Sequence, residues 1–394
     1  MMEFIWDAVD VENLYQHVLR TEGEKHPIYS PERMEECADY ILSELRSYGL
    51  ETDVHEFTID GLDYTFRNVE ATAGDDGAEL LIVSHYDTVR HSPGANDNGS
   101  AIAVMLESAR ILAQANLRGK VRFVSFNLEE GNPAFSKLYD EDKRLLGLND
   151  EEGRFLTWHT SSVLKRWRGI YHKYAFSGLG FREAMLKATE EIEENLTKNE
   201  LALLKGEQER MKDVNQVNWC GRTAMIGSCA WVEKAVTERK EIRGVLCLET
   251  MGYISEEPNS QKFPQQVDPM MFQIHGTQDD LTVGDFLTIV GDVNSKGLAN
   301  AFCDQSRHES IDLPYACLKA DFTYEQAAMA MPDILRSDHA CFWREGIPAL
   351  LMTDTADFRY PYYHTHADTI DKLDFDFLRK VCKATIATAV KYCS

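Results

Sequence analysis

The sequence predicts an α/β fold in which helices cover both faces of a mixed, mainly parallel central sheet. Continuous apolar runs recur along the chain, and such runs are typical of strands that are buried on both faces. Segments with helical character separate these runs, and this alternation favours parallel strand pairing. The chain has 394 residues, of which 44% are hydrophobic, so it can bury a substantial core.

The order of the predicted elements follows from the pattern of apolar residues. Helices are expected at residues 12–20, 31–50, 99–116 and 375–392. Two strands of alternating polarity, which should pair antiparallel, are expected at residues 51–59 and 63–72. Buried strands are expected at residues 78–85, 120–130, 242–252, 286–293 and 347–355.

The composition limits the partners and the cellular location. A formal net charge of −24 argues against nucleic acids and anionic membrane surfaces, because both are polyanions. No stretch reaches the ~20 apolar residues of a membrane span, and the N-terminus lacks the pattern of a signal peptide. The nine cysteines are scattered without a CxxC pair, so we expect reduced thiols in a cytoplasmic protein.

Chemically active side chains stand where several of the predicted buried strands end. The segment LLIVSHYDTVRHSPGANDNGSAI ends a strand on His85 and brings Asp97 in a loop rich in turn-forming residues. Other runs end on Glu129–Glu130 and on Glu249, and His364 follows the last run. Because α/β sheets bind ligands at the carboxyl ends of their strands, we expect two histidines and four carboxylates at one edge of the sheet.

Each of these residues also has an ordinary structural interpretation. A histidine at a strand end is usually a hydrogen-bonded core residue, and Asp97 could cap the helix that follows it. The pair Glu129–Glu130 could begin an exposed loop. Glu249 is harder to explain, because a carboxylate among Leu, Cys and Met is costly to bury without a partner. The six groups together would repel one another unless cations lie among them.

The ligand types indicate which cation this would be. Imidazole and carboxylate suit Zn²⁺, with Mn²⁺ or Co²⁺ as substitutes. Five protein ligands are too many for one tetrahedral catalytic zinc that also binds a water. They suit two ions roughly 3.5–4 Å apart that share one bridging carboxylate, and the sixth group is then free to act as a base.

Five motifs closely resemble those of metallopeptidase family 28, the co-catalytic di-zinc aminopeptidases of leucyl and bacterial type. They are SHYDT, GANDNGS, FNLEEGN, SDHACFWREGIPA and YHTHADTIDKLD, and the matches span residues 68–374 in the order of the family. The resemblance implies a single zinc-exopeptidase domain, a phosphorylase/hydrolase-like α/β/α sandwich.

The resemblance also implies two zinc ions as cofactors and assigns five ligands to them. His85 and Glu249 would bind one zinc, although Glu249 stands where the family usually has Asp. Glu130 and His364 would bind the other zinc, and Asp97 would bridge both. All five positions hold competent ligands, so the resemblance implies an active enzyme.

Further roles concern residues that are not metal ligands. By the same resemblance, Glu129 would be the general base and Asp87 would orient the ring of His85. Asp338 is a candidate for a supporting or substrate-facing role. His91, on a turn near the metal loop, is a candidate for contact with solvent or substrate.

The segment after the Glu-Glu motif is longer than in the relatives. We therefore predict a catalytic domain formed by residues 1–131 and 222–394 and an inserted, mostly helical subdomain at residues 132–221. A charged helix is expected in the insertion, with four apolar residues on one face: Met185, Ile192, Leu196 and Leu203. The insertion could be a lid, restrict substrate length, mediate homo-oligomerisation or be a subdomain without such a role.

The predicted function is that of a zinc-dependent aminopeptidase, which removes N-terminal residues from small peptides. By resemblance, Glu129 takes a proton from metal-activated water and returns it to the leaving amine. The alternatives on the same fold are a carboxypeptidase or amidohydrolase at the same zinc pair, and a one-zinc acyltransferase like the glutaminyl cyclases. SDH at residues 337–339 resembles a cyclase motif, whereas YHT and GANDNGS favour an aminopeptidase. A non-catalytic binding protein should have lost a ligand or the base.

Overall fold

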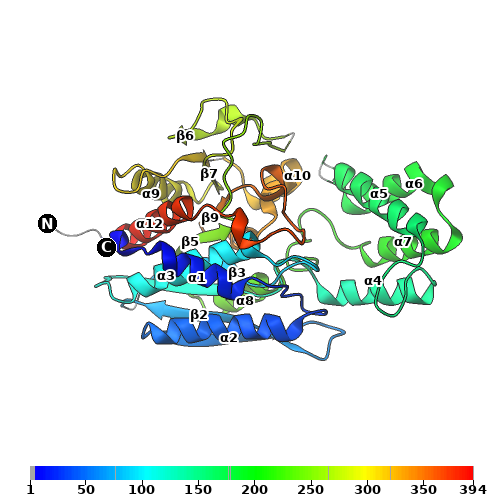
Figure 1. The fold of residues 1–394 in the computed structure, drawn as a ribbon, viewed down its shortest axis with the longest axis horizontal. Helices are drawn as coiled ribbons and strands as arrows, with labels where there is room; N and C mark the ends of the chain where they lie inside the picture. Colours follow the sequence, from blue (N-terminus) through cyan, green and yellow to red (C-terminus); the bar gives the residue numbers. More distant parts are fainter. Residues whose placement is uncertain are drawn as a thin grey trace.

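One continuous sheet runs through the computed structural model, which describes residues 5–75, 77–175, 177, 179–264, 266–319 and 321–393. The strands of this described part are β1 Glu51–Thr58, β2 Thr65–Ala73, β3 Glu79–His85, β4 Lys120–Phe126, β5 Ile242–Glu249, β6 Gln273–His275, β7 Leu287–Gly291, β8 Tyr315–Lys319 and β9 Ala349–Thr353. Their order in the sheet is β1-β2-β4-β3-β5-β9-β7-β8-β6 (Figure 1).

Parallel pairing is confined mainly to the centre of this mixed sheet. β3 pairs parallel with β4 and with β5, and β5 pairs parallel with β9. β1 and β2 pair antiparallel, which confirms the prediction from their alternating polarity. β7 runs antiparallel to β9, so its carboxyl end lies at the opposite edge of the sheet. The carboxyl ends of β3, β4, β5 and β9 therefore share one edge.

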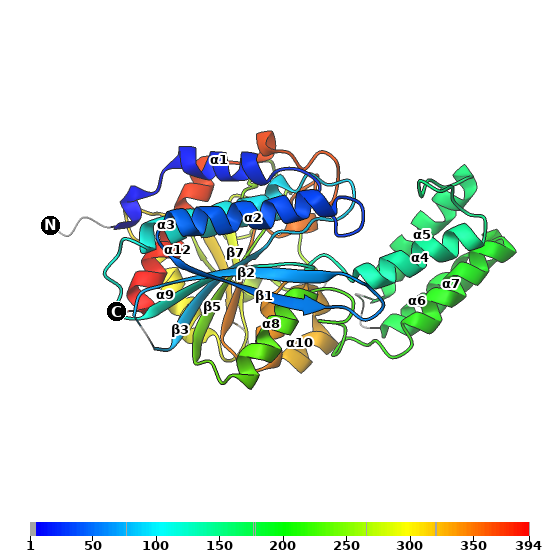
Figure 2. The same ribbon diagram turned by 90° about the horizontal axis from the view of Figure 1, so that it is seen from below.

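Helices cover both faces of the sheet (Figure 2). The first face carries α1 Val11–Thr21, α2 Pro31–Ser47, α3 Ala101–Leu112, α9 Lys296–Ser306 and α12 Phe375–Tyr392. The second carries α8 Ile226–Thr237, α10 Tyr324–Ala330 and α11 His339–Arg344. β3 shows why its sequence is apolar throughout: Leu80 and Ile82 enter the core on the first face, and Leu81 and Val83 the core on the second. Within the described ranges, no helix is long and apolar enough to cross a membrane.

Residues 132–221, called the insertion below, have a hydrophobic core of their own and project from one end of the remaining chain, called the body (Figures 1 and 2). The helices of the insertion are α4 Pro133–Leu145, α5 Trp158–Ala175, α6 Phe181–Ile192 and α7 Lys198–Arg210. The prediction of one charged helix is wrong, because the chain turns between α6 and α7. Thr197 and Glu200 form a capping box that starts the new helix.

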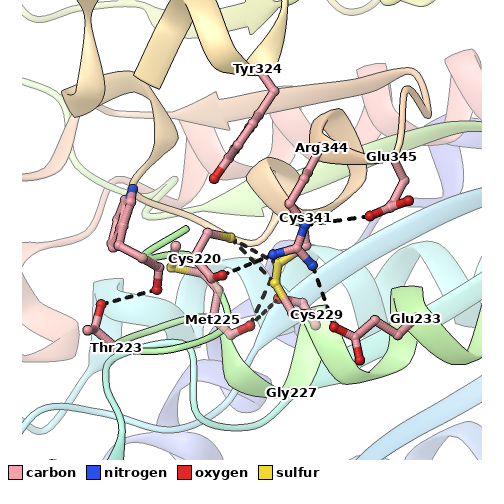
Figure 3. Close-up of a disulfide and its surroundings, with 12 residues drawn as sticks. Cys220, Thr223, Met225, Gly227, Cys229, Glu233, Tyr324, Cys341, Arg344 and Glu345 are labelled. Atoms are coloured by element: carbon pink, nitrogen blue, oxygen red, sulfur yellow. Dashed lines mark hydrogen bonds and ion pairs between the residues drawn. A yellow bond between two sulfur atoms is a disulfide. The ribbon is translucent and has the colours of Figure 1, made fainter. Parts of the chain in front are cut away.

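Three cysteine sulfurs meet on the second face of the sheet (Figure 3). A disulfide joins Cys229 of α8 to Cys341 of α11. The prediction of reduced thiols is therefore wrong for this pair, whose members are 112 residues apart in the sequence and meet only because α8 packs against α11. The Cys220 sulfur, at the end of the insertion, lies 3.4 Å from the Cys229 sulfur and 3.2 Å from the Cys341 sulfur.

Candidate metal centre

Two histidines and four carboxylates converge at the carboxyl edge of the central strands. His85 is the last residue of β3, and Glu249 is the last residue of β5. Glu129–Glu130 follows β4, and Asp97 lies in the turn Ala95–Ser100 that leads into α3. His364 lies in the loop between β9 and α12. Strands that are parallel neighbours deliver their terminal residues to one place, so these side chains meet despite their distance in the sequence.

Five of these side chains form two sets that share Asp97. Nε2 of His85 lies 3.4 Å from Oδ1 of Asp97 and 3.3 Å from Oε2 of Glu249. Nε2 of His364 lies 3.1 Å from Oδ2 of Asp97 and 3.0 Å from Oε2 of Glu130. Each oxygen of Asp97 thus faces a different histidine, which is the arrangement of a carboxylate that bridges two ions.

The donor atoms fit metal ions. Two ligands about 2.0–2.1 Å from a tetrahedral zinc are about 3.3 Å apart, close to the separations within each set. Both ring nitrogens of His85, Oδ2 of Asp97 and Oε1 of Glu130 are buried without a hydrogen-bond partner in the described part of the chain. Buried polar atoms without partners are costly. Cations at the two sets would contact Nε2 of His85 and Oδ2 of Asp97, whereas Nδ1 of His85 faces Asp87. The two sets therefore fit a pair of divalent cations such as Zn²⁺.

The site gathers more negative charge than its histidines can balance. Burial and neighbouring carboxylates together raise the pKa of Glu130 to about 7 and the pKa of Glu129 well above its usual value, even though the nearby histidines lower both. Burial alone would lower the pKa of His364, but Glu130 and Asp97 beside it raise that pKa to about 10. A metal ion replaces such protons, because its ligands are carboxylates and neutral imidazoles.

Asp87 ties the first histidine to the turn that carries the two glutamates. Its carboxylate lies 3.5 Å from Nδ1 of His85. The same carboxylate accepts hydrogen bonds from the backbone N–H groups of Glu129 and Glu130, both at 3.1 Å. Asp87 therefore orients the ring of His85 and also fixes the turn that carries Glu129 and Glu130. Only the contact with His85 was expected from the sequence. Glu129 belongs to neither ligand set, and its Oε2 lies 3.9 Å from Nε2 of His85.

The two remaining candidates, Asp338 and His91, differ in their burial and in their position relative to the candidate metal centre. Asp338 is 1% exposed and interacts electrostatically with His85 and Glu249, and burial raises its pKa to about 7. It is therefore buried close enough to the candidate metal ligands to interact with their charges. The side chain of His91 is 72% exposed, with Nδ1 3.8 Å from Glu24, and it is not among the converging residues.

Two supporting residues were missed by the sequence analysis. The hydroxyl of Ser337 donates a hydrogen bond of 2.9 Å to Oε2 of Glu249. Asp368 accepts the backbone N–H of Asp97 at 3.2 Å and so holds the turn that carries this residue. Both lie within motifs that resemble the family, SDHACF and YHTHADT, and their place in those motifs was the available signal.

Two cavities adjoin the metal centre. The first, of about 710 Å³, extends from Glu249 and Tyr363 over β7, β8 and β9. Its walls are mostly apolar and include Phe263, Val267, Phe272, Val290, Leu318, Ile334 and Leu351. The second, of about 440 Å³, borders Asp87 and Glu130 where the insertion begins, and it is lined largely by polar groups.

Known proteins resemble this chain in sequence. The profile of Peptidase family M28 matches residues 68–147 and 300–389. The uncharacterized protein YfbL of Escherichia coli K12 is 23% identical over 367 residues, which cover 90% of this chain and 79% of that protein. The aminopeptidase YwaD of Bacillus subtilis 168 is 51% identical over 51 residues, 13% of this chain and 11% of that protein.

Solved structures share the fold at low sequence identity. The LapA aminopeptidase of Legionella pneumophila matches with a TM-score of 0.56 and 14% identity, over 99% of this chain and 74% of that chain. A glutaminyl cyclase of Porphyromonas gingivalis matches with a TM-score of 0.54 and 16% identity, over 98% and 99% of the two chains. The profile match and the aminopeptidase relatives, taken with this shared fold, support a peptide hydrolase of the peptidase family M28 type.

Proposed function

We propose that the protein is a zinc-dependent aminopeptidase that uses two metal ions. The observation that carries the proposal is the division of five ligands into two sets that share Asp97, with Glu129 left outside both. This leaves one carboxylate beside the metals that is free for proton transfer.

Glu129 moves the proton in the proposed reaction. Zinc bound at the two sets would polarise the scissile carbonyl and lower the pKa of an attacking water. Glu129 takes the proton of that water and delivers it to the nitrogen of the leaving amine. Burial raises the pKa of Glu129 above its usual value, and a higher pKa makes the carboxylate a better proton acceptor. Asp87 holds the backbone of Glu129 during this transfer.

The apolar cavity beside Glu249 would take the side chain of the N-terminal residue. Its wall combines aromatic rings, such as Phe263 and Phe272, with branched aliphatic side chains, such as Val290 and Leu351. Burial of a large apolar side chain there stabilises the complex by roughly 1.5–3 kcal/mol relative to exposure to water. We therefore expect a preference for N-terminal leucine, methionine or phenylalanine over alanine.

The test separates the base from a neighbouring ligand. Glu129→Gln should keep about two metals per chain and lower kcat by roughly 10²–10⁴-fold. The matched control Glu130→Gln should lose metal as well as activity, because Glu130 belongs to a ligand set. The measurements are metal content and hydrolysis of aminoacyl p-nitroanilides and their N-blocked counterparts. Full turnover by Glu129→Gln, or hydrolysis of the N-blocked compounds, would contradict the proposal.

A glutaminyl-cyclase activity is the second candidate, because the glutaminyl cyclase of Porphyromonas gingivalis shares this fold over nearly the whole chain. Such an activity closes an N-terminal glutamine onto its own amine and releases ammonia. Incubation of the metal-loaded protein with a glutaminyl peptide separates the two functions. Release of free glutamine supports the aminopeptidase, and release of ammonia with loss of the free amine supports the cyclase.

The cytoplasmic location stays a prediction. The Cys229–Cys341 disulfide weighs against it, because disulfides persist mainly outside the reducing cytosol. Thiol alkylation of the protein as isolated from its own cells, followed by mass spectrometry, would show in which state this pair occurs.

A further inference from the structure

The polar cavity beside Glu130 lies between the body and the insertion. Its lining comes from three segments: residues 26–27 near the N-terminus, residues 87–90 after β3, and residues 130–136, where the body continues into the insertion. Because Asp87 and Glu130 are part of the lining, a group in this cavity is adjacent to the metal centre. The cavity, of about 440 Å³ including space open to solvent, can admit the end of a short peptide.

Arg90 supplies the positive charge of this cavity. Its guanidinium carbon lies 3.8 Å from the centre of the Tyr29 ring, which holds the side chain in place by a cation–π contact. Its Nη2 donates only a long hydrogen bond, of 3.4 Å, to the backbone oxygen of Glu152. In the described part of the chain, no carboxylate lies within ion-pair distance of Arg90. Burial lowers the pKa of His26, the other basic residue of the lining, so His26 adds little charge near neutral pH.

A guanidinium without an ion-pair partner is suited to binding an anionic ligand. Arginine presents a planar set of donors that matches the two oxygens of a carboxylate. The chain carries a net charge of −24, and the metal centre gathers four carboxylates, so an anionic substrate needs a cation on its path to the site. Arg90 meets this need at the wall of a cavity that borders the centre.

The insertion closes the outer side of Arg90. A Cβ atom on Gly153 would lie 3.4 Å from Nη1 of Arg90. Tyr29 also contacts the insertion, because its hydroxyl hydrogen-bonds to Asp140. Each residue of an extended peptide adds about 3.3–3.6 Å to its length. A peptide long enough to pass Arg90 would therefore meet these segments of the insertion.

We propose that the polar cavity is a carboxylate-binding subsite in which Arg90 binds the C-terminal carboxylate of a short peptide. The substrates are then dipeptides and tripeptides with a free carboxylate. This inference rests on the proposed function, because it takes the metal centre as the place of cleavage. The apolar cavity takes the N-terminal side chain, and the polar cavity takes the end of the peptide that leaves.

Binding of a matched pair of peptides tests the subsite without turnover. Leu-Gly and Leu-Gly amide differ only in the terminal charge, and their affinities are measured by calorimetry with the metal-loaded Glu129→Gln protein. We expect the free acid to bind at least about tenfold tighter than the amide. Adding Arg90→Gln should reduce this ratio to about one, and Arg90→Lys, which keeps the charge, should retain part of it.

Arg154→Gln is the matched control. It removes a positive charge from the loop of the insertion that contains Gly153. Arg154 is paired there with Asp150 and Glu152, and it does not line the cavity. This variant should keep the acid-to-amide ratio. A ratio that falls equally in Arg154→Gln and Arg90→Gln would overturn the proposal, since the effect would then come from net charge.

The remaining outcomes are also distinct. Equal affinities for acid and amide in the parent protein, or no binding of either, would overturn the subsite. A preference for the acid that depends on Arg90, in a protein that hydrolyses neither peptide when Glu129 is present, supports the subsite and contradicts the proposed function.

Discussion

The body and the insertion differ in net charge, in buried acidic groups and in the size of their hydrophobic cores. The insertion contributes 14 of the 41 basic and 15 of the 65 acidic side chains, so nearly all of the net charge of −24 belongs to the body. The body also buries its acids at the metal centre and carries the disulfide. The insertion has a small core and exposes Leu145 (86%) and Trp158 (84%). A homo-oligomer contact through the insertion stays a prediction, and a lid role does too.

Electrostatic repulsion is concentrated in the body. Converging carboxylates destabilise the metal centre in the absence of cations, so the surrounding body must hold them together. The insertion needs only ordinary helix packing. The two regions meet close to the proposed base, where the backbone N–H of Asn132 in the insertion donates to the backbone oxygen of Thr223 in the body at 2.8 Å. Within the body, the N–H of Met225 donates to the backbone oxygen of Glu129 at 2.9 Å.

Loss of the disulfide should lower the free energy of unfolding more than the other changes, and the body should be the region destabilised. The Cys229–Cys341 bond closes a segment of 112 residues, and a cross-link of a loop of about that length stabilises the fold by about 4–5 kcal/mol. The free energy of unfolding should fall by that amount in Cys229→Ser/Cys341→Ser, as measured by urea denaturation. Reductant should destabilise the wild type but not this variant. A wild type insensitive to reductant would mean that the bond is absent or contributes nothing.

Trp167→Ala should destabilise the insertion while leaving the body intact. Trp167 is 7% exposed, stacks on Tyr171, and donates from its ring N–H to Thr189 at 3.0 Å. Its truncation should cost about 3–5 kcal/mol. Hydrogen exchange should accelerate in residues 132–221 first, and the exposed Trp158→Ala should change little. Equal acceleration in the body would show that the two regions unfold as one unit.

Acid should weaken the body through His17, with a smaller effect. Burial lowers the pKa of this side chain, which is hydrogen-bonded to the Tyr40 hydroxyl at 2.7 Å, from 6.5 to about 4. Between these pH values the unfolded chain binds a proton that the folded chain does not, so stability is lost as the pH falls from 6.5 to about 4. The total loss is about 3 kcal/mol. Unfolding of His17→Gln across this pH range should lack this loss, and an identical slope in wild type and variant would contradict it.

Much of the fold and of the candidate ligand sets could be predicted from the sequence, because both depend on the pattern of apolar residues along the chain and on the residues at strand ends. A β3 run that is apolar on both faces can only be a central strand, and such a strand delivers its last residue, His85, to the sheet edge. The helix predicted at 375–392 coincides with α12 for a similar reason, since its apolar spacing is unbroken. The break between α6 and α7 was missed, because the apolar spacing continues across it and only the Thr197 cap interrupts the helix.

Strand polarity and short motifs are properties of neighbouring residues, so the amino-acid sequence was enough to indicate the family, the sheet and the side chains that end its central strands. Three contacts become visible in the folded molecule alone: Cys229 meets Cys341, Ser337 hydrogen-bonds to Glu249, and Arg90 lines a polar cavity without an ion-pair partner in the described chain. Such contacts join residues far apart in the sequence. Their formation depends on how α8, α11 and the insertion pack against the sheet, and no local pattern records that packing.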